Sequence, residues 1–179
     1  MVQLAEIYQG LHLNNDRDSD LVTGTVLPIR FYELVKKELQ YAKRAESSLT
    51  LVSFGFKLSD KSALILEKFD ISKVESEYLI SEILDLLMKT AFKAENSLRS
   101  NESISRIGAL TFCILIREGE SAAQILISRL MPILEKALFQ FSINLKEKKI
   151  TFFDLEVFSA SITRSGGTTL EELLDGLEI

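Results

Sequence analysis

The sequence offers few side chains of the types that commonly catalyse reactions. His12 is the one histidine, so we expect a packing or surface residue rather than a catalytic base. Cys113, the one cysteine, lies inside the apolar run 110–116, where burial would keep the thiol protonated and unreactive. Gly166 and Gly167 precede a helix-capping sequence, but no lysine follows them at the spacing of a phosphate-binding loop. We therefore predict no cofactor, no metal ion and no disulfide, and we expect a reducing compartment.

Composition and charge exclude several classes of protein. The 179 residues are 46% hydrophobic and 26% charged, which is typical of one folded domain. A net charge of −5 lacks the basic excess that binding to nucleic acid or to an anionic membrane surface would favour. The longest apolar stretch, residues 107–116, is far shorter than the roughly 20 residues of a membrane-spanning helix. The N-terminus has no basic start and no unbroken apolar run, so we predict a cytoplasmic protein.

The N-terminal half reads as two helices around one strand. Residues 1–19 are predicted to form a short helix and a polar linker, and residues 20–179 one domain. Pro28 suits a first helical position, and apolar residues then recur at spacings of three and four to about residue 44. The apolar run 48–56 predicts a buried strand. A capping box, Ser72 to Glu75, opens the next helix, which runs to about residue 91.

The C-terminal half adds a hairpin, a long helix, a strand and a last short helix. Two apolar runs, 104–107 and 110–116, flank a predicted turn at Gly108. A second capping box, residues 121–124, opens a helix to about residue 141, in which Pro132 predicts a kink or a break. Residues 150–162 predict a strand with a possible turn at Asp154, and the box 169–172 caps a short helix. A tight hairpin between two helices indicates a ferredoxin-like α+β fold with a mostly antiparallel sheet.

Three separated segments resemble one family. Residues 20–25 (DLVTGT), followed by Phe31 and a helix, are similar to the D-x-L-T-G-L entry of GGDEF domains, the diguanylate cyclases. Residues 106–112 (RIGALTF) stand where that family has R-x-G-G-D-E-F, and residues 159–163 (SASIT) stand where it has a late S-I-G-I-A strand. No single motif is intact, so the resemblance rests on their order and spacing over roughly residues 20–178.

The resemblance implies a fold and a reaction. The fold would be a nucleotidyl-cyclase palm, and the reaction would join two GTP molecules into cyclic di-GMP with the help of divalent metal ions. The signature itself is degenerate in this chain: its five positions are Gly108, Ala109, Leu110, Thr111 and Phe112.

The positions that carry metal-binding carboxylates in the family have changed. They are occupied here by Gly55, at the end of the first strand, and by Thr111 in the signature, and neither carries negative charge. A further acidic position of the strand matches Lys57, and the acidic third position of the signature is Leu110. Asp60 is the one nearby carboxylate that a shifted alignment could recruit. Because the metal ions supply much of the transition-state stabilisation, we predict a catalytically dead domain.

Two further family sites map onto this chain. The residues that hold guanine correspond approximately to Ala63 and Leu64. The product-binding R-x-x-D motif corresponds to residues 99–102, in which Arg99 is kept and Glu102 replaces the aspartate with a longer acid. An arginine and an acid can together bind a guanine edge. The plainer interpretation is that both are solvated charges after a helix, with Arg99 near its negative dipole end.

These observations lead to two hypotheses about function. The first is an inactive GGDEF-like signalling domain that acts through protein–protein contacts, including self-association. The alternative is an effector that binds cyclic di-GMP or a guanine nucleotide through Arg99 and Glu102 without turning it over.

Overall fold

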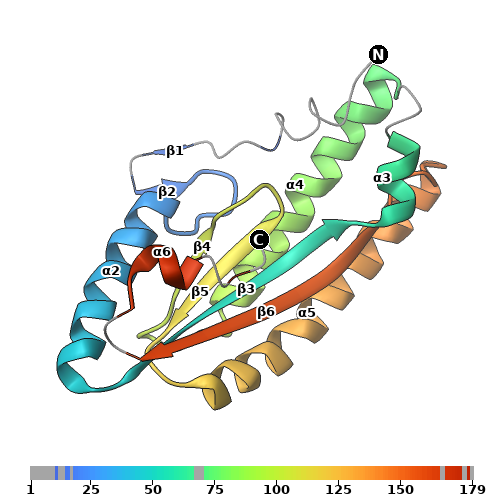
Figure 1. Ribbon diagram of the computed structural model, residues 1–179. Coiled ribbons are helices and arrows are strands. Elements are labelled where there is room, and N and C mark those ends of the chain that lie inside the picture. The colour runs from blue at the N-terminus through green and yellow to red at the C-terminus, as the bar shows by residue number, and fades with distance from the viewer. Residues whose placement is uncertain are drawn as a thin grey trace.

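A computed structural model describes residues 11, 15–16, 18–66, 71–165, 168–174 and 177 of the chain (Figure 1). The predicted N-terminal helix and the Gly166-Gly167 loop lie outside the described residues. The elements in chain order are β1 (Asn15–Asp16), β2 (Ser19–Asp20), α2 (Pro28–Ala45), β3 (Ser48–Leu58), α3 (Asp60–Leu66), α4 (Lys73–Glu95), β4 (Ser103–Arg106), β5 (Thr111–Ile116), α5 (Glu120–Glu147), β6 (Leu155–Ser165) and α6 (Leu170–Leu174).

The centre of the fold is a four-stranded sheet in the order β4-β5-β3-β6, antiparallel throughout. Helices α4 and α5 pack on one face of the sheet, and α2 and α6 lie on the other (Figure 1). The predicted α+β class with a mostly antiparallel sheet is therefore confirmed. The hairpin predicted at Gly108 is also present, between β4 and β5.

Strand β3 contributes side chains to both cores. Val52, Phe54 and Phe56 point toward α4 and α5, while Leu49 and Leu51 point toward α2 and α6. This follows from the alternation of side chains along a strand, and it explains why nearly the whole of β3 reads as an apolar run. The Phe54 ring stacks on Phe112 of β5 at a centroid distance of 5.4 Å.

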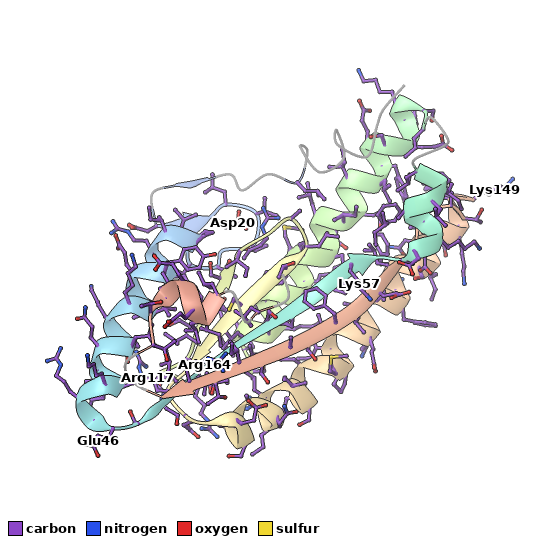
Figure 2. The ribbon with its side chains drawn as sticks, in the orientation of Figure 1. Asp20, Glu46, Lys57, Arg117, Lys149 and Arg164 are labelled. Atoms are coloured by element: carbon purple, nitrogen blue, oxygen red, sulfur yellow. The ribbon has the colours of Figure 1, made fainter. Side chains whose placement is uncertain are left out.

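Three helix starts follow the sequence signals. Pro28 is the first residue of α2. The helix ends at Ala45, and its C-cap Glu46, labelled in Figure 2, is in the left-handed conformation. Ser72 and Glu75 form the predicted capping box of α4. The Thr169 hydroxyl accepts from the Glu172 N–H, and the Glu172 carboxylate accepts from the Thr169 N–H, so this predicted cap is also confirmed.

Helix α5 differs from its prediction both at its start and at Pro132. Its N-cap is Gly119 and makes no side-chain cap, so the capping box predicted at 121–124 is wrong. The helix begins at Glu120, one residue before the predicted box, and the Glu120 carboxylate accepts hydrogen bonds from Ser161 and Thr163 of β6. A break at Pro132 is also wrong, because the helix continues through it to Glu147. Pro132 is exposed, so the carbonyl that it leaves without a helical donor can face water.

Other boundaries shift as well. Strand β6 begins at Leu155 rather than 150. The Asp154 backbone just before it is bound to Ser59 and to helix α3: its carbonyl accepts from Ser59 N–H, and its N–H donates to Ser62 Oγ. Helix α3 was not predicted. The polar linker contains a short antiparallel pair, β1 with β2.

Candidate functional site

The loop between β4 and β5, residues 107–110, is held closed by the backbone. The Thr111 carbonyl accepts from the N–H groups of Ile107 and Gly108 at 2.9 and 3.2 Å. Leu110 is buried, and Ala109 packs against the core beneath α4 and α5. Leu110, at a position where the resemblance implies an acid, is therefore packed into the protein.

The two positions that the sequence matched to metal-binding carboxylates lie side by side. Gly55 of β3 is the direct cross-strand partner of Thr111 of β5. In the chain, helices α3 and α4 and strand β4 lie between the two residues. On its other side Gly55 pairs with Phe158 of β6. Thr111, Gly55 and Phe158 thus form a row across three strands, on the same face as α2, and we refer to them as the site row.

The backbone conformation of Gly55 is one that other residues rarely adopt. Its φ is +150°, and a Cβ built at this position would lie 2.2 Å from the Leu110 carbonyl oxygen. That carbonyl accepts a hydrogen bond of 3.1 Å from the Phe56 N–H, so the hairpin is fixed against β3. The hairpin backbone therefore occupies the space that any side chain at position 55 would need.

The residues of this region do not fit a magnesium site. Hard divalent cations prefer carboxylate and carbonyl oxygens, and the site row offers a hydroxyl, a glycine and an aromatic ring. Lys57 points to the same face and forms an ion pair of 3.3 Å with Glu156 (Figure 2). Asp60 lies in the first turn of α3. Within the described part of the chain, no three histidine, cysteine, aspartate or glutamate side chains form a group that could hold a metal ion.

The two positions matched to guanine binding lie on α3. Ala63 is half-buried, and the Leu64 side chain is exposed. Neither offers a hydrogen-bonding side chain to a base. The hydroxyls of Ser59 and Ser62, at the start of α3, are hydrogen-bonded to each other.

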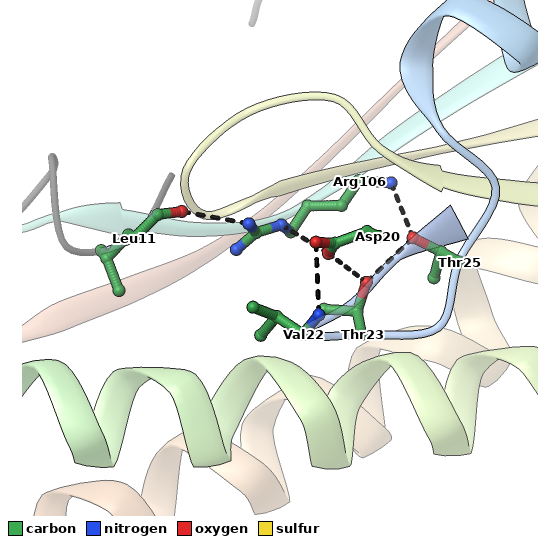
Figure 3. A network of polar contacts seen from close by, with 6 residues as sticks. All are labelled: Leu11, Asp20, Val22, Thr23, Thr25 and Arg106. Carbon is green, nitrogen blue, oxygen red and sulfur yellow. Dashed lines mark hydrogen bonds and ion pairs between the residues drawn. The ribbon is translucent and has the colours of Figure 1, made fainter. Parts of the chain in front are cut away.

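The first two segments of the resemblance, residues 20–25 and 106–112, meet at a buried ion pair (Figure 3). Arg106 Nε lies 3.0 Å from Asp20 Oδ2, and both side chains are fully buried. The Asp20 carboxylate also accepts from the Thr23 hydroxyl at 2.6 Å and from the Val22 N–H at 3.4 Å. The Arg106 N–H donates to the Thr25 hydroxyl at 3.1 Å. This network joins the loop after β2 to the end of β4.

Arg106 also reaches the N-terminal part of the chain. Its Nη2 donates to the Leu11 carbonyl at 3.0 Å, while its Nη1 has no hydrogen-bond partner among the described residues. Burial lowers the pKa of the Arg106 guanidinium, and the charge of Asp20 opposes that shift. The guanidinium stays charged, so the network acts as a fixed structural support for the hairpin.

Arg99 and Glu102 lie together in the turn between α4 and β4, but each already has a partner. The Glu102 carboxylate accepts from the Arg99 backbone N–H at 2.8 Å. The Arg99 guanidinium donates instead to Glu118, at 2.6 Å. Both residues line a shallow depression of about 330 Å³ next to Ser100 and Ser103. The sequence did not indicate Glu118, because the contact joins two loops 19 residues apart.

The remaining residues of interest are Cys113, His12 and Phe158. Cys113 is fully buried in β5, where desolvation raises the pKa of its thiol, so it stays protonated. His12 lies outside the described residues. Phe158 is the member of the site row that the sequence analysis missed, because pairing between β3 and β6 is not visible in either strand alone.

Solved structures share this fold. The GGDEF domain of DgcB from Caulobacter crescentus, in complex with c-di-GMP, is 13% identical with a TM-score of 0.53, and the match covers 92% of this chain and 87% of that one. The FimX GGDEF domain from Pseudomonas aeruginosa is 18% identical with a TM-score of 0.57, covering 89% and 88%. Diguanylate cyclase SiaD from the same organism, in complex with its activator SiaC, is 15% identical with a TM-score of 0.55, covering 88% and 54%.

At these identities the similarity establishes the fold alone. The chain has the nucleotidyl-cyclase palm of a GGDEF-like domain, as the resemblance implied. No protein-family model and no curated protein matches the sequence. Among the described helices, none is both long and apolar enough to cross a bilayer.

Proposed function

We propose that this chain is a catalytically inactive GGDEF-like signalling domain that acts through protein–protein contacts. The observation that carries the proposal is the site row. Gly55 and Thr111 lie next to each other at the positions matched to the family's metal-binding carboxylates, and neither can bring a carboxylate to a metal ion. Without such ligands the charge that develops during phosphoryl transfer has no counterion.

The packing of the hairpin supports the same proposal. In a working site the signature must face water and substrate, but here Leu110 is buried and its carbonyl is hydrogen-bonded to β3. A contact function needs a stable scaffold and a surface rather than an open catalytic cleft. The complex of SiaD with its activator SiaC supports protein contacts as a role for this fold.

The test is incubation of the purified chain with GTP and either Mg²⁺ or Mn²⁺. We expect no cyclic di-GMP above the level of a buffer control in product analysis by mass spectrometry. Circular dichroism on the same sample establishes that the protein is folded. Product formed in proportion to protein concentration would refute inactivity.

The alternative function is an effector that binds cyclic di-GMP or a guanine nucleotide. The depression lined by Arg99 and Glu102 favours it, and the complex of DgcB with c-di-GMP supports a ligand of that class. The ion pair of Arg99 with Glu118 argues against it, because the ligand would have to displace a contact of 2.6 Å.

Titration calorimetry with cyclic di-GMP and with GTP separates the two functions. The contact function predicts no heat of binding with either ligand. Heat that disappears in Arg99→Ala, and persists in Arg129→Ala on the exposed surface of α5, would establish the effector function instead.

We also propose the cytoplasm as the compartment of this domain. The single cysteine is buried as a free thiol, which is consistent with a reducing environment.

A further inference from the structure

The two edges of the central sheet differ. Beside β4, Val26 forms a parallel bridge with Ser105, and its N–H donates to the Ile104 carbonyl at 3.1 Å. That edge is therefore covered by the segment before α2. Strand β6 at the other edge pairs with β3, and no further strand among the described residues pairs with it. Its outward N–H and C=O groups are a template for another strand.

The sequence of β6 lacks the usual protection of an edge strand. Residues 157–163 (VFSASIT) contain no charge and no proline, and charged residues stand only at Glu156 and Arg164. Side chains on both faces of this stretch are half-buried, except for Ile162, which is buried. Phe158 belongs to neither core. A long, uncharged edge of this kind favours pairing with a second strand.

We propose that β6 pairs with β6 of a second copy of this chain, antiparallel and centred on Ala160, to form a continuous eight-stranded sheet. This rests on the proposed contact function and names its partner. In this register Glu156 lies opposite Arg164 of the second copy, and Arg164 lies opposite the second Glu156. A two-fold axis through Ala160 thus produces two matching ion pairs at the ends of an uncharged strand.

The charges are placed correctly for this register. The positions of Glu156 and Arg164 differ by eight, an even number, so both side chains lie on the face of the sheet that carries α2. Figure 2 shows Arg164 near one end of β6 and Lys57, the ion-pair partner of Glu156, near the other. Each Glu156 carboxylate would then lie between Lys57 of its own chain and Arg164 of the second copy. A shift of two residues in either direction separates Glu156 from Arg164.

The centre of the strand also fits. Phe158 lies opposite Ile162 of the second copy, which gives a half-buried aromatic ring an apolar neighbour across the strands. Within its own chain Phe158 pairs with Gly55, which has no side chain to cover it. Ala160 meets itself on the two-fold axis, where a small residue allows close approach.

The first experiment measures mass by sedimentation velocity over a concentration series. We expect a reversible dimer, with a limiting mass twice the 20.2 kDa of the chain. Ala160→Lys places two cations together on the axis and is expected to give a monomer. Ser103→Lys makes the same kind of change on the covered edge β4 and is expected to leave the dimer intact. A wild-type chain that stays monomeric, or a dimer that survives Ala160→Lys, overturns the proposal.

The second experiment tests the register by charge reversal. Glu156→Arg or Arg164→Glu alone creates two like-charge pairs and is expected to weaken the dimer about tenfold, while the double variant restores opposite charges and returns the dissociation constant to within about threefold. Circular dichroism checks that each variant is folded. A double variant as weak as the singles excludes this register. Turnover of GTP is measured separately, so a failed dimer and a failed inactivity proposal are told apart.

Discussion

Gly55 is the residue on which the geometry of the candidate site depends. The hairpin carbonyl of Leu110 lies where a Cβ at position 55 would be, and the glycine φ of +150° is unfavourable for any other residue. An acid introduced at position 55 would not create a metal site, because its Cβ would collide with the hairpin carbonyl of Leu110. The glycine at position 55 and the inward packing of the hairpin therefore depend on each other.

Gly55→Ala is predicted to lower the free energy of unfolding by about 3 kcal/mol, because strain in φ adds to overlap with the Leu110 carbonyl. Gly24→Ala is the matched control: Gly24 also has a positive φ, +75°, but a Cβ there meets nothing within 4 Å. We expect a loss of about 1 kcal/mol for the control. Urea unfolding followed by circular dichroism measures both, and equal losses would show that the hairpin does not constrain position 55.

The buried pair of Asp20 and Arg106 gives a second prediction. Asp20→Leu leaves a buried guanidinium without its counterion and should cost about 3 to 5 kcal/mol. Arg106→Met similarly leaves Asp20 buried, whereas the double variant removes both charges and should cost less than the sum of the singles. A double-mutant cycle from chemical denaturation measures the difference, and strict additivity would mean that the pair does not interact.

The sequence predicted the separate members of the site but not their contacts. Gly55 and Thr111 were identified as changed positions from the resemblance, and their adjacency required the register of β3 with β5. Asp20 and Arg106 were each part of a resembling segment, yet nothing local indicated that they pair. Phe158 was missed for the same reason, since strand pairing is a property of two distant segments.

At the scale of the elements, sequence patterns predicted a helix start correctly where contacts between neighbouring residues determine that start. The capping box at Ser72 depends on four consecutive residues and was predicted correctly. The box at 121–124 failed because Glu120 is bound by Ser161 and Thr163 from β6, which no local pattern reveals. Helix α3 spans only seven residues, too few for a clear helical period.

Pro132 gives a prediction at this scale. It interrupts the hydrogen-bond ladder of a continuous helix at an exposed position, so Pro132→Ala should raise the free energy of unfolding by about 1 to 3 kcal/mol. Pro28→Ala is the control, because a first-turn proline removes no helical hydrogen bond and its replacement should change stability by less than about 1 kcal/mol. Thermal unfolding of both variants checks the contrast. A destabilising effect of Pro132→Ala would show that the proline makes packing contacts that outweigh the lost hydrogen bond.

At the scale of the whole molecule, one sheet separates two cores. Apart from α3 and the short β1–β2 pair, the order of helices and strands from residue 28 onward was predictable, because apolar periodicity distinguishes buried strands from amphipathic helices. Which helix covers which face was not, since both faces of β3 are apolar. Leu87 of α4 lies in one core and Leu173 of α6 in the other, and both are fully buried.

Because β3 contributes to both cores, we predict that they unfold together. Leu87→Ala and Leu173→Ala should each cost about 2 to 5 kcal/mol, and each should lower the protection of the amides in α2 and in α4 by the same amount. Native-state hydrogen exchange, read out by mass spectrometry on peptides from the two helices, measures this coupling. If Leu173→Ala reduced protection only in α2 and α6, the two faces would be separate cooperative units. In that case a contact on the α2 face could be made or lost without disturbing α4 and α5. A single unit instead means that pairing at the edge strand stabilises both layers at once.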